Sequence, residues 1–383
     1  MKILLYDMSA YAQKDLVYYL KRGGCICRSL LYSFPDKYHD AFFEKKFEEQ
    51  LLLDDYDVVM SMNFFPIVAK ICSRHNIKYI SWVYDSPINC GHLEDYCYPT
   101  NYIFVFDRVE AERIGRMGNF NVFHLPLAVN VERMHHMVIE PTDRLTYSAD
   151  ISFVGQFYGN PLKAAMEYMG DYEKGYIDAL IRTQFRIYGY DFIEEMITEE
   201  FTQKINGQLI SGNPNQKPVL RRELHDAVRK HITHLERLVL CNMLGHKHQM
   251  NYYSGEQPQQ LSHLHYGGTV GYFTEMPKVF RLSKLNLNPT LRSIQSGIPL
   301  RALDILGSGG VLFSNYQPEL AEYFEDGVDA IMYESVEDAL EKADYYIKND
   351  QIRLAIAEKG YQKICEQFSY PDRIAYMFRT AGL

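Results

Sequence analysis

Short apolar segments alternate with amphipathic segments through the first third of the chain, and this alternation restricts the fold more than any other feature. Strands are expected at residues 2–6, 25–31, 57–60, 77–84, 102–106 and 122–125, with helical patterns in most of the intervals. Six strands within roughly 130 residues, joined by helices, are typical of a doubly wound parallel sheet. The N-terminal part of the chain is therefore predicted to be an α/β domain of that kind.

A second series of strands begins near residue 150, after a polar linker. The expected strands are at 150–155, 250–253, 269–272, 285–288, 311–313 and 330–333. Between about 161 and 245 the pattern is helical and contains no clear strand, which predicts a helical insertion. Because 383 residues exceed one ordinary core, we expect two domains, 1–140 and 141–365, followed by a C-terminal helix at 366–383.

Composition and charge exclude several classes of protein. The net charge is −9, whereas a general nucleic-acid binder needs a basic field. The first residues hold only a short apolar run before Asp7, which does not fit a signal peptide, and no segment approaches a transmembrane span. Seven scattered cysteines indicate reduced thiols rather than a disulfide framework. We therefore expect a cytoplasmic protein with no nucleic-acid partner and no transmembrane segment.

Polar residues follow four of the expected strands in the first domain. They are Asp7, Asn63, Asp85 and Asp107. Ligands of a doubly wound sheet bind outside the carboxyl ends of its strands, so these side chains are predicted to line one rim of a binding site. The alternative is that they cap the helices that follow. Capping explains Asp107 well, but it explains Asp85 less well because Ser-Pro and a loop-like stretch follow it.

The segment 296–333 predicts a helix, a glycine turn, a buried strand, a second helix and a second strand in succession. Arg301 and Asp304 are three residues apart and so share one face of the first helix. The turn contains Gly309 and Gly310. A cation and an acid near a helix N-terminus suit a ligand that carries both phosphates and hydroxyls. A surface ion pair on an ordinary helix is the alternative.

Two doubly wound domains and a C-terminal helix resemble the GT-B glycosyltransferase architecture. In that architecture two Rossmann-like domains face each other across a cleft, and the last helix packs back toward the first domain. Three local strings are similar to those of family-4 glycosyltransferases, in the same order: Trp82-Val-Tyr84-Asp85, Phe153-Val-Gly155 and Pro289-Thr290. Tyr84 stands where that family has histidine, and the first of the family's two donor-binding glutamates has no match.

Two further strings narrow the resemblance. They are Gly297-Ile-Pro-Leu-Arg301 and Asp304-Ile-Leu-Gly-x-Gly-Gly310. With the strings above, they resemble the CgeB-like (spore-maturation) group of glycosyltransferase-related proteins. The resemblance spans nearly the whole chain except the insertion.

The resemblance implies a nucleotide-diphosphate sugar donor, linked to UDP, dTDP or GDP, and a glycan or protein acceptor, without a metal ion. Positive charge is needed where the diphosphate leaves, and Arg281, Lys284 and Arg301 are the candidates for it. Asp304 stands for the second family glutamate and is expected on the ribose hydroxyls, while Tyr272 could face the base. The full donor-side set is Gly155, Tyr272, Arg281, Lys284, Thr290, Arg301, Asp304, Gly309 and Gly310.

On the acceptor side, Asp85 is the candidate general base or acceptor-positioning group, because a carboxylate can take the proton of an acceptor hydroxyl. Asn63, Tyr84 and Asp107 accompany it. Two other functions remain open: a nucleotide-sugar epimerase of the same architecture, and a non-catalytic binding or assembly protein. In the non-catalytic case the helical insertion would be a docking surface, and it is separately a candidate surface for homo-oligomer formation.

Overall fold

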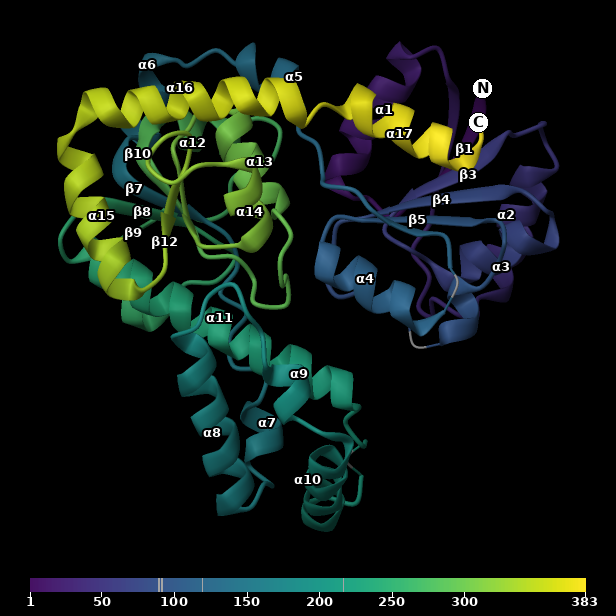
Figure 1. Cartoon of the computed structure of the whole chain (residues 1–383), viewed down its shortest axis with the longest axis horizontal. Coiled ribbons are helices and arrows are strands. Elements are labelled where there is room, and N and C mark those ends of the chain that lie inside the picture. The colour runs from purple at the N-terminus through teal and green to yellow at the C-terminus, as the bar shows by residue number, and fades with distance from the viewer. Residues whose placement is uncertain (89, 91, 119, 216) are drawn as a thin grey trace. The chain divides into compact units, whose positions relative to one another are not determined.

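The computed structural model describes the whole chain except residues 89, 91, 119 and 216. The chain forms two compact units, each built on a six-stranded parallel sheet (Figure 1). The first unit comprises Met1–Arg133, Ser296–Gly307 and Lys363–Leu383, and the second comprises Met134–Gln295 and Ser308–Gln362. Two doubly wound α/β domains, as the alternation of segments predicts, are therefore confirmed.

The sheet of the first unit has the strand order β2-β1-β3-β4-β5-β6, and every neighbouring pair is parallel. The strands are β1 (Lys2–Asp7), β2 (Ile26–Leu31), β3 (Val58–Met62), β4 (Lys78–Val83), β5 (Asn101–Val105) and β6 (Val122–His124). The helices are α1 (Tyr11–Arg22), α2 (Ala41–Leu51), α3 (Pro66–Arg74), α4 (Arg108–Met117), α13 (Leu300–Gly307) and α17 (Tyr370–Ala381). The central strands are apolar and buried on both faces, as a parallel sheet covered by helices requires.

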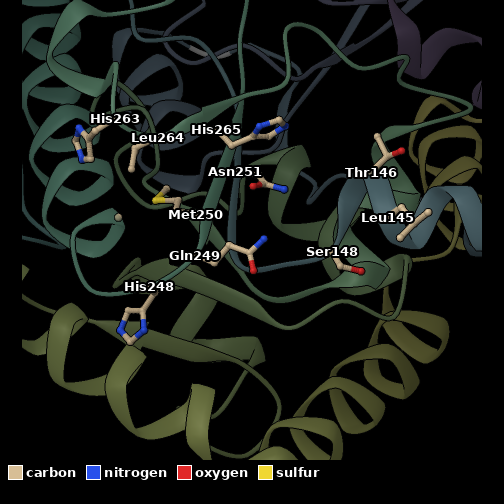
Figure 2. Close-up of a pocket in the computed structure, with 11 residues that line it drawn as sticks. Leu145, Thr146, Ser148, His248, Gln249, Met250, Asn251, His263, Leu264 and His265 are labelled. Atoms are coloured by element: carbon tan, nitrogen blue, oxygen red, sulfur yellow. The ribbon is translucent and has the colours of Figure 1, made fainter.

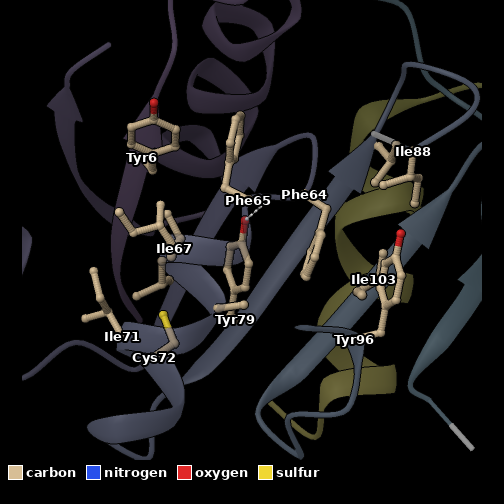
Figure 3. Packing of buried hydrophobic residues seen from close by; sticks show 14 of the residues in the cluster. Tyr6, Phe64, Phe65, Ile67, Ile71, Cys72, Tyr79, Ile88, Tyr96 and Ile103 are labelled. Carbon is tan, nitrogen blue, oxygen red and sulfur yellow. Dashed lines mark hydrogen bonds between the residues drawn. The ribbon is translucent and has the colours of Figure 1, made fainter. Parts of the chain in front are cut away.

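A buried chain of hydrogen bonds fixes the connection after β3, and Figure 3 shows its bond between Phe65 and Tyr79. The amide of Phe65 donates to the Tyr79 hydroxyl oxygen at 3.2 Å, and this hydroxyl lies 2.6 Å from Ser61 Oγ. Ser61 Oγ in turn donates to the carbonyl oxygen of Asn63 at 2.6 Å. The hydroxyls of Ser61 and Tyr79 and the amide of Phe65 are thus paired within the apolar core, and these bonds hold Asn63 at the end of β3.

The sheet of the second unit has the order β12-β11-β10-β7-β8-β9, again entirely parallel. Its strands are β7 (Ala149–Val154), β8 (Met250–Tyr253), β9 (His265–Tyr266), β10 (Ser283–Asn288), β11 (Leu312–Asn315) and β12 (Ile331–Tyr333). Helices next to the sheet are α6 (Pro141–Tyr147), α12 (Met276–Leu282), α14 (Pro318–Tyr323) and α15 (Val336–Lys348). Two helices cross a boundary between the units, α5 (Val131–His135) and α16 (Asp350–Gln367).

The strand expected at 269–272 is wrong, because the edge strand β9 lies earlier and is only two residues long. Gly267 and Gly268 follow it. A side chain at Gly267 would meet the ring of Tyr253, and Gly268 has a φ of +69°, so the backbone leaves the sheet here.

The helical insertion between β7 and β8 is confirmed. It consists of α7 (Lys163–Met166), α8 (Asp171–Phe185), α9 (Ile193–Met196), α10 (Glu199–Gly212) and α11 (Arg221–Gly245). The first half of α11 packs into the core of the insertion through Leu224, Val228 and Ile232, and its last turns pack under the sheet through Leu240 and Leu244. A single continuous helix therefore joins the two cores of the second unit (Figure 1).

The C-terminal helix α17 returns to the first unit, where it packs against α1, β4 and β5. The ring of Tyr370 stacks on Tyr19 with centroids 5.2 Å apart and meets Trp82 edge-on at 5.8 Å. Among the residues that the structure describes, no helix has the length and apolar character needed to cross a bilayer.

Candidate functional site

Asp7, Asn63, Asp85 and Asp107 all lie just past or at the carboxyl ends of β1, β3, β4 and β5. These four strands are consecutive neighbours in the sheet. Because parallel strands end at the same edge, the four residues occupy one rim of the first unit, which we call the first rim. Ligands of doubly wound sheets bind at this edge.

Asn63 organises the connection that follows β4. It adopts a φ of +66°, a conformation that asparagine tolerates better than most residues. Its Oδ1 accepts hydrogen bonds from the amides of Tyr84 at 3.0 Å and Asp85 at 3.3 Å, and its Nδ2 donates to Asp85 Oδ2 at 2.7 Å. The sequence-predicted residues Asn63, Tyr84 and Asp85 are thus brought into direct contact.

Asp85 is an exposed residue, yet the protein packed around its carboxyl group raises its pKa, and the hydrogen bond from Asn63 opposes that rise. Burial, and secondarily Asp85, raise the pKa of the neighbouring Tyr84 hydroxyl to about 12. A carboxyl group with a raised pKa that solvent can still reach has the properties of a general base or acid.

Asp107 is fully buried and acts as a connector. Its Oδ2 accepts from Ser86 Oγ at 2.8 Å, and its Oδ1 accepts from Ser296 Oγ at 2.8 Å and the Ser296 amide at 3.2 Å. Asp107 stands at the N-cap position of α4, but its side chain makes no capping bond. The capping alternative considered from the sequence is therefore wrong for Asp107, because its carboxylate joins the loop after β4 to a segment 189 residues away.

In the second unit, Gly155 and Thr290 follow the carboxyl ends of β7 and β10, which are paired strands. The Thr290 amide donates to Asn315 Oδ1 at 2.7 Å. Thr290 Oγ1 is buried and has no hydrogen-bond partner among the described residues. We call the loops after β7 and β10 the second rim.

Arg237, in the middle of α11, holds both loops of the second rim. Its Nε and Nη2 donate to the Pro289 carbonyl oxygen at 3.2 and 2.7 Å, and its Nη1 donates to the carbonyl oxygen of Gln156. The guanidinium also lies 5.5 Å from the ring centroid of Phe153 and 5.1 Å from that of Tyr158. The hydrogen bonds join this arginine to the turns that follow two adjacent strands.

The charge of Arg237 has no acidic partner within 4.0 Å among the residues that the structure describes. Arg237 is only 8% exposed. Buried charges are ordinarily paired, so a buried guanidinium with only neutral acceptors and aromatic faces leaves positive potential at this edge of the sheet. No sequence motif singled out Arg237, since its role depends on contacts with segments distant in the chain.

Neighbouring residues of α11 hold the same loops. Thr233 Oγ1 accepts from the amide of Arg292 at 3.0 Å, and Glu236 Oε2 accepts from Arg292 Nε at 2.9 Å. His234 Nδ1 lies 2.9 Å from the carbonyl oxygen of Phe157. Two successive turns of the insertion's last helix thus fix the conformation of the second rim.

Two donor-side candidates, Lys284 and Arg281, lie at the opposite edge of the second sheet. Lys284 is the second residue of β10 and pairs with Asp150 at 2.9 Å, and Arg281 precedes that strand and donates to the Met137 carbonyl oxygen at 3.0 Å. Tyr272 lies in the turn before α12, where its ring contacts Phe273 edge-on. Lys284 and Arg281 are thus at the other end of β10 from Thr290.

Gly309 and Gly310 also precede a strand, β11, and so lie at its amino end. Gly309 has a φ of +76°, which favours glycine. A Cβ atom on Gly310 would lie 2.6 Å from the carbonyl oxygen of Phe280 and 2.8 Å from Asn286 Nδ2. The turn is therefore shaped by close packing against α12 and β10.

Arg301 and Asp304 share one face of α13, as expected, with Arg301 Nη1 3.7 Å from Asp304 Oδ2. This helix clusters with the first unit, and Asp304 is only 1% exposed. The Tyr370 hydroxyl of α17 is nearby: burial, followed by the charges of Asp15 and Asp304, raises its pKa well above the ordinary value. Asp304 is thus a buried carboxylate beside α17.

Comparison with known proteins gives a partial family match. The profile described as "Glycosyl transferase-like" matches residues 220–379, which contain α11, Thr290 and most of the second sheet. No curated protein matches the sequence.

Solved structures of similar fold cover nearly the whole chain. Sucrose-phosphate synthase of Thermosynechococcus elongatus has a TM-score of 0.59 and 10% identity, and the match covers 99% of this chain and 98% of that one. A glycosyltransferase of Rickettsia africae ESF-5 has a TM-score of 0.56 and 10% identity, and the match again covers 99% of this chain and 98% of that one. The Anabaena protein HepE, solved in complex with UDP-glucose, has a TM-score of 0.55 and 9% identity, and the match covers 100% of this chain and 99% of that one. At this identity the likeness concerns the fold alone, and the fold is the GT-B architecture expected from the sequence.

Proposed function

We propose that this chain is a glycosyltransferase that moves a sugar from a nucleotide-diphosphate donor to an acceptor hydroxyl of a glycan or protein, without a metal ion. The profile match at residues 220–379 and the GT-B fold support this class of activity. HepE was solved with UDP-glucose, so a uridine donor is the first to test, with dTDP and GDP sugars beside it. Membership of the CgeB-like group and self-association through the insertion stay predictions.

The observation that carries the proposal is the buried guanidinium of Arg237 at the second rim, whose charge has no acidic partner within 4.0 Å among the described residues. When a sugar leaves a nucleotide diphosphate, negative charge grows on the departing phosphate, and catalysis requires positive potential there. Arg237 lies behind the turns at Gly155 and Thr290, where a doubly wound domain takes its ligand. We therefore propose the second rim as the donor-phosphate site.

We do not assign Asp304 to the ribose or Lys284 to the phosphates. Asp304 is almost completely buried, and Lys284 lies at the amino end of its strand in an ion pair. Thr290, with its unpartnered buried hydroxyl, is the better candidate for a polar contact with the donor.

On the acceptor side we propose Asp85 as the general base. Asn63 fixes its orientation, and solvent reaches its carboxyl group. Asp107 is a positioning residue, because its buried carboxylate contacts only neighbouring protein groups in its described hydrogen bonds.

The test is nucleotide release from UDP-, dTDP- and GDP-linked sugars, with and without candidate acceptor glycans and peptides, in the presence of EDTA. Acceptor-dependent release of nucleotide is expected. A changed sugar without an acceptor would instead indicate the epimerase, and no binding of any nucleotide would indicate the non-catalytic alternative.

A further inference from the structure

A polar pocket of about 390 Å³ lies at the amino ends of β7, β8 and β9. This is the edge of the second sheet opposite the second rim, so the pocket is separate from the proposed donor site. Its volume falls within the range of small-molecule sites. The lining residues are Leu145, Thr146, Ser148, Gly245, His248, Gln249, Met250, Asn251, His263, Leu264 and His265.

Three side chains line up along one wall (Figure 2). Asn251 of β8 and His265 of β9 are paired in register, so parallel pairing sets them side by side on one face. Gln249 is two residues before Asn251, and Figure 2 shows the two amides near each other with His265 beyond them. Thr146 and Ser148 lie on the other side of the pocket.

These groups offer both donors and acceptors to a ligand. In the described part of the chain, the amide side chain of Gln249 and the ring of His265 make no hydrogen bond to protein. The side chain of Asn251, although the residue is only 4% exposed, lines the pocket. Two primary amides, an imidazole and the hydroxyl of Ser148 can together donate and accept several hydrogen bonds.

The pocket wall carries no lysine, arginine, aspartate or glutamate among its described lining residues. His248 Nε2 lies 2.8 Å from Asp344 Oδ1, an acidic group outside the lining. A charged ligand would lose water here without gaining a counter-charge, which is unfavourable. The described residues also form no metal-binding group of three or more ligands. The wall therefore favours a neutral, hydrogen-bonding ligand.

One end of the pocket has a flat, less polar surface. The ring of His263 stacks on that of His246 with centroids 4.3 Å apart and planes 11° from parallel. In Figure 2, Leu264 and Met250 lie between His263 and the polar wall. A ligand that has hydroxyls on its rim and C–H groups on its faces matches this combination of surfaces.

We propose that this pocket binds a neutral saccharide unit, with the amides of Gln249 and Asn251 and the imidazole of His265 on its hydroxyls. The site is independent of sugar transfer: it lies at the other edge of the sheet and uses none of the residues proposed for that reaction.

The test is ligand-observed NMR on the full chain, titrated with glucose, galactose, mannose and N-acetylglucosamine, and with glucuronate and glucosamine as charged counterparts. Binding of at least one neutral sugar in the millimolar range is expected. The variants His265→Ala and Gln249→Ala should each weaken that binding about fivefold, the worth of one neutral hydrogen bond. Both side chains are exposed, so neither substitution threatens the fold.

The matched control is His39→Ala, which removes an exposed histidine of the first unit and should leave the affinity unchanged. Three results would overturn the proposal: no binding of any neutral sugar, tighter binding of glucuronate or glucosamine than of the neutral sugars, or equal binding by the two pocket variants and the unmodified chain. Because the readout is binding of free sugar, the result does not depend on whether the chain transfers sugar.

Discussion

The two rims lie at equivalent edges of two similar sheets. Within each rim a buried charged side chain joins the loops, and the two side chains have charges of opposite sign. In the first rim a buried carboxylate, Asp107, joins the loops, and a second carboxylate, Asp85, faces solvent. In the second rim a buried guanidinium, Arg237, joins the loops through their carbonyl oxygens. An acidic rim suits the removal of a proton from an acceptor, and a basic rim suits a departing diphosphate. Two similar sheets thus carry loop connectors of opposite charge, and the proposed function assigns a different chemical task to each.

The largest effect is expected from Arg237→Met. The change removes the positive potential of the second rim and leaves the carbonyl groups of Gln156 and Pro289 without their partner. We expect kcat/KM for sugar transfer to fall about 1,000-fold, as when a group that stabilises developing charge is lost. Steady-state kinetics with the donor found in the nucleotide-release panel measure it.

Arg237→Lys is the control, because lysine keeps the charge but cannot bridge both carbonyl groups in the same way. It should recover part of the activity. If Arg237→Met folds and retains full kcat/KM, the donor assignment of the second rim is wrong.

Asp85→Asn should lower kcat about 100-fold, the typical contribution of a general base, while donor affinity stays unchanged. Asparagine preserves the shape but cannot accept the acceptor's proton. Kinetics combined with donor titration separate the two quantities. A loss of donor affinity with unchanged kcat would move Asp85 from the acceptor side to the donor side.

Asp107→Ala tests the connector of the first rim. It removes the acceptor of the hydrogen bonds that Ser86 Oγ, Ser296 Oγ and the Ser296 amide donate. We expect the free energy of unfolding to fall by about 3 kcal/mol. Urea denaturation can be followed by the fluorescence of Trp82, the single tryptophan, which is buried in the first unit. An unchanged unfolding midpoint would contradict the connector role.

The smallest effect is expected from Asn63→Gly. Glycine accepts the φ of +66°, so the change removes the hydrogen bond to the Asp85 carboxylate, and the two bonds from the Tyr84 and Asp85 amides, without straining the backbone. The bond to the carboxylate favours its charged form, and its loss should raise the already elevated pKa of Asp85 further. A base works only when deprotonated, so the acid limb of the kcat/KM profile should move to higher pH, by less than about one unit. Movement to lower pH would contradict Asp85 as the base.

The first rim was predictable from the sequence because strand ends are encoded locally. The apolar runs before Asp7, Asn63, Asp85 and Asp107 mark the strands, and parallel pairing brings their ends together. What each residue does there was not predictable. Asp107 stands at an N-cap position, and only a partner 189 residues away shows that its carboxylate is used elsewhere.

The second rim was predicted in part. Gly155 and Thr290 follow strands and lie at the carboxyl edge, whereas Lys284 and Gly310 precede or begin strands and lie at the amino edge. Whether a residue comes before or after its strand in the sequence is enough to predict at which edge of the sheet it lies. Arg237 could not be found in this way, since it bonds to carbonyl groups 52 and 81 residues away through a helix of the insertion.

The most direct test of the account is a calorimetric comparison of UDP and uridine binding to the unmodified chain and to Arg237→Met. The two ligands differ by the diphosphate, so the ratio of their affinities reports the contribution of the phosphate site. We predict that UDP binds the unmodified chain at least about tenfold more tightly than uridine, and that this advantage disappears in Arg237→Met. An equal advantage in both proteins would contradict a donor-phosphate site at the second rim.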